Sequence, residues 1–284
     1  MIDPHAVEDI LNGCNSPKTR KLYGYCLNDF MTWYQASERK DLGVSTLMAY
    51  RAKLTKSNLS SSTINSNLLV AKKLACYQNQ DDPMKVWSIE RNVKAMPQNR
   101  VKARKVLTLE QIKRVLASCH DGTVRGCRDE AMIALMFGAG LRKSEVPKLD
   151  LTDFDGMDLL IRQSKGRKTR YVPLPEWAIR RLKAWLGVRP PIDGERAIFI
   201  AWSRGRMSER NIYAVFIERT KKAGFEGFHP HNARTSYVTH LLKLKNDIAV
   251  VSRLVGHSDV QTTVTYDLRG DEEMRLAVNT FKLD

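Results

Sequence analysis

Six side chains, from residue 142 onward, have the types and the order that suit a metal-free phosphoryl-transfer site. They are Arg142, Lys165, His231, Arg234, His257 and Tyr266. Arginine binds phosphate oxygens, histidine and lysine move protons, and a tyrosine becomes a nucleophile where cations stabilise its phenolate. Each residue alone is ordinary. Their order and spacing together indicate chemistry at a phosphate.

The arginines lie where a phosphate is easily bound. Arg142 follows a Gly-Ala-Gly-Leu turn and precedes an expected short helix, whose N-terminus favours anions. Glu145, one turn later, is expected to orient that guanidinium, although surface Arg/Glu pairs at this spacing are common. His231 and Arg234 are at positions i and i+3 at the start of another expected helix, so they share a face and can bind the same anion.

Lys165 lies in the most basic short stretch of the chain, at a glycine turn between two expected strands. Such a turn is often only a solvated hairpin tip. It also suits entry into a DNA groove, and neighbouring cations lower the pKa of a lysine that donates a proton. The cations around it are candidate DNA-binding residues: Arg162, Arg167, Lys168 and Arg170.

The histidines and cysteines do not indicate a metal site. His229, His231, His240 and His257 are close in sequence, but no carboxylate or thiolate cluster at ligand spacing accompanies them. His240 falls on the apolar face of its expected helix and is interpreted as a core residue. The five cysteines are scattered without a C-x-x-C pair, which predicts buried thiols in a reducing compartment and no disulfides.

Composition favours a polyanionic partner. The 284 residues carry a formal net charge of +16, and 43% of them are hydrophobic. Basic proteins can be basic for solubility alone, but the charge favours nucleic acid as the partner. The start of the chain is not a signal peptide and no apolar run is long enough for a membrane span. We therefore expect a cytoplasmic protein, nucleoid-associated when bound to DNA.

The first 95 residues are expected to form a helical domain. After about fifteen loose residues, Ser16-Pro17 opens a helix whose buried stripe is Leu22, Cys26, Phe30 and Trp33, and further helices are expected at 45–54, after 60–62 and at 85–95. A basic linker follows over 96–105. Its cations are expected either to be solvated or, as we prefer, to lie along a phosphate backbone: Arg100, Lys102, Arg104 and Lys105.

The second domain, 106–284, is expected to be mainly α with a small antiparallel β-sheet. A capping box at Thr108–Gln111 precedes its first helix, and Pro147 should shorten the helix after Arg142. The remaining expected elements are helices at 128–137, 176–186, 208–223, 231–243, 247–255 and 272–280, strands at 157–162 and 169–173, and an edge strand at 197–201.

The set of motifs resembles the tyrosine recombinase (phage integrase) family. Residues 108–284 resemble its catalytic domain and residues 17–95 its helical core-binding domain, and the resemblance implies that the two form a clamp around double-stranded DNA. All six active-site positions are filled in order, including the His231-x-x-Arg234 box and Leu-Val-Gly-His257-Ser. The chain departs from the family pattern at Thr235, Ala233, Ser164 and Pro147, none of which removes a catalytic side chain.

The resemblance implies a mechanism. Tyr266 attacks the scissile phosphate, giving a 3′-phosphotyrosine and a free 5′-hydroxyl. Arg142, Arg234 and His257 stabilise the phosphorane, His231 assists proton transfer, and Lys165 protonates the leaving oxygen. Neither ATP nor a metal is required.

The resemblance also implies an assembly. Family members act as a homotetramer on two DNA sites, with a monomer allowed off DNA, and the C-terminal tail packs into a neighbouring subunit. Met274, Val278 and Phe281 form an apolar stripe in this tail that suits docking in trans, although docking in cis is the alternative. The short segment before the first expected helix indicates a minimal two-domain member without an arm-binding domain.

Two other functions use similar residues. A type IB topoisomerase nicks and reseals one duplex with the same constellation, and strand exchange between two labelled sites separates it from a recombinase. A DNA-binding regulator with a silent site would bind DNA without forming a covalent adduct. The target sequence, the choice between integration, excision and resolution, and any accessory proteins are not encoded in these motifs.

Overall fold

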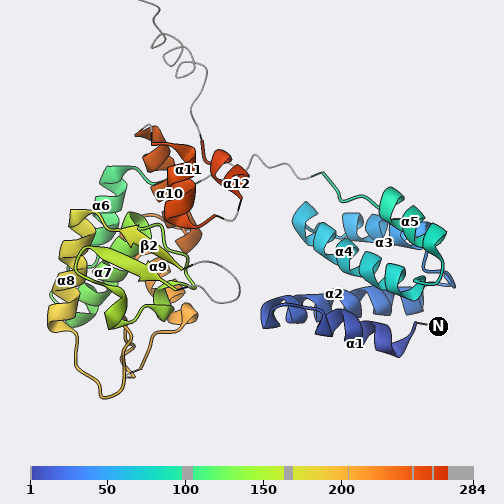
Figure 1. Ribbon diagram of the computed structural model, residues 1–284, viewed down its shortest axis with the longest axis horizontal. Coiled ribbons are helices and arrows are strands. Elements are labelled where there is room, and N and C mark those ends of the chain that lie inside the picture. Colours follow the sequence, from blue (N-terminus) through green and yellow to red (C-terminus); the bar gives the residue numbers. More distant parts are fainter. Residues whose placement is uncertain are drawn as a thin grey trace, which may run out of the picture. The chain divides into compact units, whose positions relative to one another are not determined.

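The computed structural model describes residues 2–97, 105–162, 169–203, 205–244, 246–257 and 259–267. The chain divides into two compact units, Met1–Lys102 and Ala103–Asp284. We call them unit 1 and unit 2 (Figure 1). The molecule is mostly helical with a small two-stranded antiparallel sheet, which confirms the expected fold class.

Unit 1 is a bundle of helices. Its elements are α1 (Pro4–Asn12), α2 (Pro17–Ala36), α3 (Val44–Lys56), α4 (Ser61–Gln78) and α5 (Pro83–Asn92). Ser16 and Ser60 cap α2 and α4, because each hydroxyl accepts a hydrogen bond from the backbone N–H three residues later. The sequence prediction missed α1, which begins at a proline and is capped by Asp3.

The core of unit 1 is aromatic at its centre. The rings of Phe30 and Tyr50 meet edge to face at 4.8 Å, and the Tyr50 hydroxyl donates to Asp29 at 2.6 Å. Cys26 and Phe30 are buried as predicted, but Leu22 is 47% exposed, so its place in the buried stripe was wrong.

Unit 2 holds the remaining elements. They are α6 (Leu109–Ala117), α7 (Val124–Gly138), the short 3-10 helices η1 (Val146–Lys148) and η2 (Leu151–Asp153), β1 (Asp158–Ile161), β2 (Arg170–Pro173), α8 (Glu176–Val188), α9 (Glu209–Lys222), α10 (Pro230–Lys243), α11 (Ile248–Val255) and α12 (Val260–Val264). The predicted capping box at Thr108 is present. Strands β1 and β2 are antiparallel, with Ile161 opposite Arg170.

Two sequence predictions for unit 2 were wrong. Residues 197–201 form isolated bridges, Ala197 to Asp150 and Ile200 to Arg206, rather than a third strand. Arg142 does not lead an α-helix, because only the 3-10 turn η1 follows, with Pro147 inside it. The predicted helix at 272–280 lies outside the described residues.

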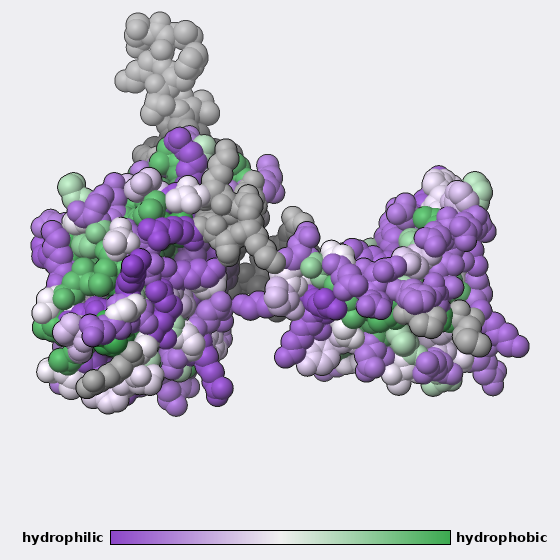
Figure 2. Space-filling view, turned by 60° about the horizontal axis from the view of Figure 1, so that its bottom comes forward, coloured by the Kyte–Doolittle hydropathy of each residue, from purple (hydrophilic) through white to green (hydrophobic). Residues whose placement is uncertain are grey.

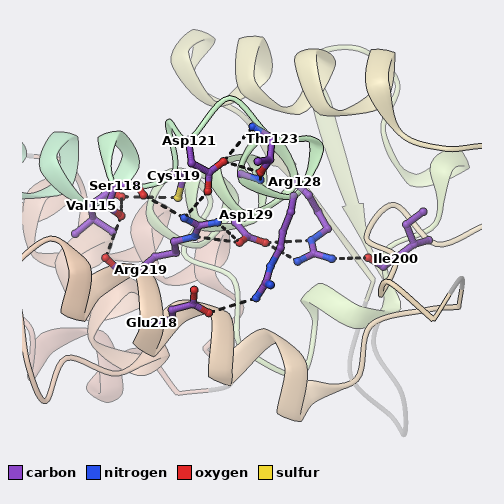
Figure 3. A network of polar contacts seen from close by, with 12 residues as sticks. Val115, Ser118, Cys119, Asp121, Thr123, Arg128, Asp129, Ile200, Glu218 and Arg219 are labelled. Atoms are coloured by element: carbon purple, nitrogen blue, oxygen red, sulfur yellow. Dashed lines mark hydrogen bonds and ion pairs between the residues drawn. The ribbon is translucent and has the colours of Figure 1, made fainter.

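A buried ion network joins α7 to α9 (Figure 3). Asp129 is fully buried, and its two oxygens receive one arginine each: Arg128 at 2.7 and 3.1 Å, and Arg219 at 2.8 and 3.0 Å. Arg219 also donates to Asp121 at 3.0 Å. Burial would lower the pKa of Arg219, but its hydrogen bonds to Asp129 and Asp121 outweigh burial and raise it. Two arginines and two aspartates therefore balance in charge.

Asp129→Asn should destabilise unit 2 by about 3 to 5 kcal/mol, because it leaves two buried guanidinium groups without their shared charge. Urea unfolding of the whole chain measures this loss. The matched control, Glu110→Gln, breaks an exposed pair with Lys113 and should cost less than about 1 kcal/mol. Equal costs for the two variants would contradict the role given to Asp129.

The surface is predominantly polar. Figure 2 shows hydrophilic residues over most of both units in that view, with hydrophobic residues gathered in patches on unit 2. Among the helices of the described residues, none is long and apolar enough to cross a membrane.

Candidate active site

The C-terminal end of α11 is where the predicted site assembles. Three consecutive backbone carbonyls there each accept a hydrogen bond from a different arginine. Arg170 Nε donates to Leu254 at 3.1 Å, Arg234 Nη2 to Val255 at 2.6 Å, and Arg142 Nη2 to Gly256 at 2.7 Å. These carbonyls lack partners within the helix and form its negative end, so cations are stabilised there.

Glu145 is the carboxylate of this cluster. Its oxygens accept from Arg142 Nη1 at 2.8 Å and from both terminal nitrogens of Arg170 at 3.0 Å, while the Arg142 backbone N–H donates to Oε2 at 2.8 Å. Burial raises the pKa of Glu145, but the hydrogen bonds and charge of Arg170, followed by the hydrogen bonds of Arg142, outweigh it and lower the pKa. Glu145 is therefore ionised near neutral pH, as its predicted supporting role requires.

Arg234 is a buried cation with an unusual environment. Its side chain is 2% exposed, and its guanidinium donates to the carbonyls of Gly140, at 2.8 Å, and Val255. Within the described part of the chain, no carboxylate forms an ion pair with it. Burial, followed by the charge of Arg142, lowers the pKa of Arg234 to about 10. Arg219, buried to the same degree, has two aspartates. Arg234 stays charged and lacks this compensation, so an anion beside it would be strongly favoured.

His257 follows the αL residue Gly256 and is half-buried. Its Nδ1 is 2.8 Å from the Thr263 hydroxyl, and its ring stacks on Tyr266 with centroids 5.8 Å apart. Burial, then the charges of Arg234 and Arg142, lower the pKa of His257 to about 4. In the tautomer that carries its proton on Nε2, the neutral ring accepts from the Thr263 hydroxyl through Nδ1 and has a donor at Nε2.

Tyr266 and His231 complete the group. The Tyr266 side chain is 5% exposed and packs with Val238, Val251 and Val255. Arg234 lies near enough for the charge of Tyr266 to affect the pKa of its guanidinium. His231 is exposed at the start of α10 and close enough to His257 to affect that ring's pKa. Five of the six predicted catalytic residues therefore lie together.

The sixth residue, Lys165, lies outside the described residues. So do most of the predicted DNA-binding cations: Arg100, Lys102, Arg104, Arg167 and Lys168. Lys105 is described, and its Nζ donates to the Gly227 carbonyl at 3.3 Å. Arg162 is half exposed and pairs with Asp153 at 2.7 Å. Arg170 is 9% exposed and held by Glu145, a position unlike that of a DNA-contacting side chain.

Sequence reasoning missed Thr263 and named Gly256 only as part of the motif around His257. Thr263 orients His257, and Gly256 adopts φ of +65°, the left-handed conformation that ends α11. The signal for Gly256 was its position after a short apolar helix. Thr263 carried no distinguishing signal among three threonines in four residues. His240 is half-buried, and its Nε2 lies 2.8 Å from the Leu107 carbonyl, which confirms its structural interpretation.

No group of three histidine, cysteine, aspartate or glutamate side chains could hold a metal ion in the described residues. The site's donors are guanidinium, imidazole and phenol groups, which suit a phosphate rather than a cation.

Comparison with known proteins identifies the family. Residues 105–272 match the model of the phage integrase family. The chain belongs to this family. It is a tyrosine recombinase, an enzyme that cleaves and rejoins DNA strands.

Individual relatives agree with this assignment. The chain is 29% identical over 273 residues to tyrosine recombinase XerA of Thermococcus kodakarensis, covering 94% of this chain and 90% of that protein. It is 32% identical over 244 residues to XerC of Actinobacillus pleuropneumoniae, covering 84% and 78%. A pre-cleavage structure of the XerH site-specific recombinase bound to difH substrate shares the fold, with a TM-score of 0.71, 20% identity and coverage of 93% of this chain and 79% of that chain.

The low pKa of His257 gives a pH-dependent prediction. Its folded pKa is about 4, whereas an unperturbed histidine has a pKa near 6.5, so the unfolded chain binds more protons between these values. Wild type should therefore lose stability relative to His257→Gln as the pH falls from about 6.5 to about 4. Urea unfolding of both proteins at several pH values measures the difference. A difference that stays constant across this window would contradict the assignment.

Proposed function

We propose that this tyrosine recombinase acts at specific DNA sites through a covalent 3′-phosphotyrosine on Tyr266. The observation that carries the proposal is Arg234, a buried guanidinium without a carboxylate partner among the described residues, beside Arg142, His257 and Tyr266. A DNA phosphate supplies the missing anion. The XerH structure bound to its difH substrate supports DNA as the partner.

The reaction follows from the placement of charge. The Tyr266 oxygen forms a bond to phosphorus as the bond from phosphorus to the 5′-oxygen breaks. Arg142 and Arg234 stabilise the charge that develops on the non-bridging oxygens, and His257 donates from Nε2. His231 assists removal of the phenol proton, and Lys165 gives a proton to the 5′-oxygen. Attack by a 5′-hydroxyl from the partner strand reverses the bonds, so strands exchange without ATP.

Tyr266→Phe should abolish the covalent adduct while leaving DNA affinity within about twofold, because only the attacking oxygen is removed. The assay incubates protein with a nicked substrate that carries the DNA flanking its gene and detects the adduct on a denaturing gel. Tyr171→Phe is the matched control, since Tyr171 is a 67% exposed tyrosine of the same unit. An adduct with Tyr266→Phe, or none with wild type, would refute the proposal.

We also propose that the active assembly is a homotetramer on two DNA sites, linked by C-terminal tails. An apolar groove of about 620 Å³ lies between α6, α7, the start of α8 and the end of α10. Its lining includes the exposed side chains Leu109 and Leu244, 62% and 74% exposed. The apolar stripe of Met274, Val278 and Phe281 in a neighbouring copy has the chemistry to fill it.

Leu244→Glu should abolish synapsis of two DNA sites, because it places a charge in the groove, yet leave adduct formation on a single site within about threefold. Electrophoresis of complexes with two labelled sites measures synapsis. The tail variant Phe281→Glu should have the same effect, and the double variant no greater effect. Unchanged synapsis in both variants would place the interface elsewhere.

A further inference from the structure

Arg170 is buried where a DNA-contacting residue was expected. It is the first residue of β2 and follows directly after the segment that contains Lys165. Its guanidinium spans Glu145 with two bonds of 3.0 Å and donates Nε to Leu254 at 3.1 Å. Each of the three guanidinium nitrogens of Arg170 therefore has a partner within the protein, and none requires DNA as a partner.

The bidentate contact between Arg170 and Glu145 affects how much positive charge Arg142 retains for binding a phosphate. A carboxylate paired with one arginine alone would neutralise it. Here Arg170 occupies both oxygens of Glu145, while the Arg142 guanidinium reaches only one of them, at 2.8 Å. The cluster of Arg142, Arg170 and Glu145 keeps one net positive charge beside Arg234. Arg142 is oriented by Glu145 without being neutralised by it.

Arg170 also supports the backbone that carries His257. Gly256 lies against it, and a Cβ at Gly256 would come within 3.0 Å of Nη1 and 3.2 Å of Cδ. The carbonyl of this same glycine holds Arg142 at 2.7 Å. The position of Arg170 therefore sets the end of α11, the direction of Arg142 and the starting point of His257.

We propose that Arg170 is a positioning residue of the cleavage site, which leaves Arg142 charged for the phosphate and fixes the α11 end that presents His257. This inference rests on the proposed function. It predicts that a residue of β2, rather than of the DNA interface, controls the rate of the chemical step.

The test compares Arg170→Gln with Arg219→Gln. Both variants remove a buried bidentate arginine and should lower the melting temperature, but only Arg170 adjoins the site. In single-turnover cleavage below both transitions, Arg170→Gln should be roughly 100-fold slower than wild type and Arg219→Gln within about threefold. Arg170→Lys, which keeps the charge but not the fork, should fall between wild type and Arg170→Gln. Equal slowing by the two glutamine variants would reduce Arg170 to a stability role and overturn the proposal.

A double variant and salt dependence separate positioning from DNA contact. Arg170→Gln leaves Glu145 paired with Arg142 alone, so that the carboxylate neutralises Arg142, and adding Glu145→Gln should recover at least about fivefold of the rate. DNA affinity and its salt dependence should match wild type. If Arg170→Gln instead lowers the salt slope by about one and Glu145→Gln recovers nothing, Arg170 contacts a phosphate and the proposal is wrong.

A measurement on the protein without DNA tests the positioning role of Arg170 independently of cleavage. In spectra of protein with ¹³C-labelled histidine, Arg170→Gln should shift the His257 ring resonances and Arg219→Gln should leave them in place. A shift in His257 together with a wild type that forms no adduct would refute the proposed function but retain the positioning role. Unmoved His257 resonances would overturn the inference itself.

Discussion

The end of α11 is the constraint on which the site depends. A helix of eight residues ends at Gly256 with carbonyls that need donors, and three arginines from separate segments supply them. Arg142 comes from the turn after α7, Arg170 from β2 and Arg234 from α10. Each arginine gains a fixed direction from its carbonyl, and each carbonyl gains a cation at the negative end of the helix. The same end of the helix leads directly into His257.

The two ion clusters of unit 2 differ in net charge. Around Asp129, two arginines meet two aspartates, so the network carries no excess charge and serves stability. Around Glu145, three arginines meet one carboxylate and leave two net positive charges. An imbalance of this kind is costly in a buried place unless an anion enters. Under the proposed function, this cost falls on the protein without DNA and is offset when a phosphate of the DNA binds beside the arginines.

Much of the fold could be predicted from the sequence, because helix caps depend on residues that are close together in the chain. Caps such as Ser16, Ser60 and Thr108 act over three residues, so helix starts were predicted closely. Residues 197–201 are apolar and look like a strand, but they form two isolated bridges, Ala197 to Asp150 and Ile200 to Arg206, and a local apolar pattern does not distinguish such bridges from a strand. The candidate catalytic residues were predicted from their order and spacing. The role of Arg170 could not be predicted in this way, because within a basic segment the sequence does not distinguish a buried arginine from a DNA-binding arginine.

The most direct measurement of the central claim is the structure of the protein bound to its DNA site before cleavage. One backbone phosphate should place non-bridging oxygens about 3 Å from the guanidinium groups of Arg142 and Arg234 and from His257 Nε2, with Tyr266 in line behind it. Arg170 should still hold Glu145 and make no contact with DNA. A structure in which the phosphate lies elsewhere, with Arg234 bonded only to Gly140 and Val255, would contradict the account.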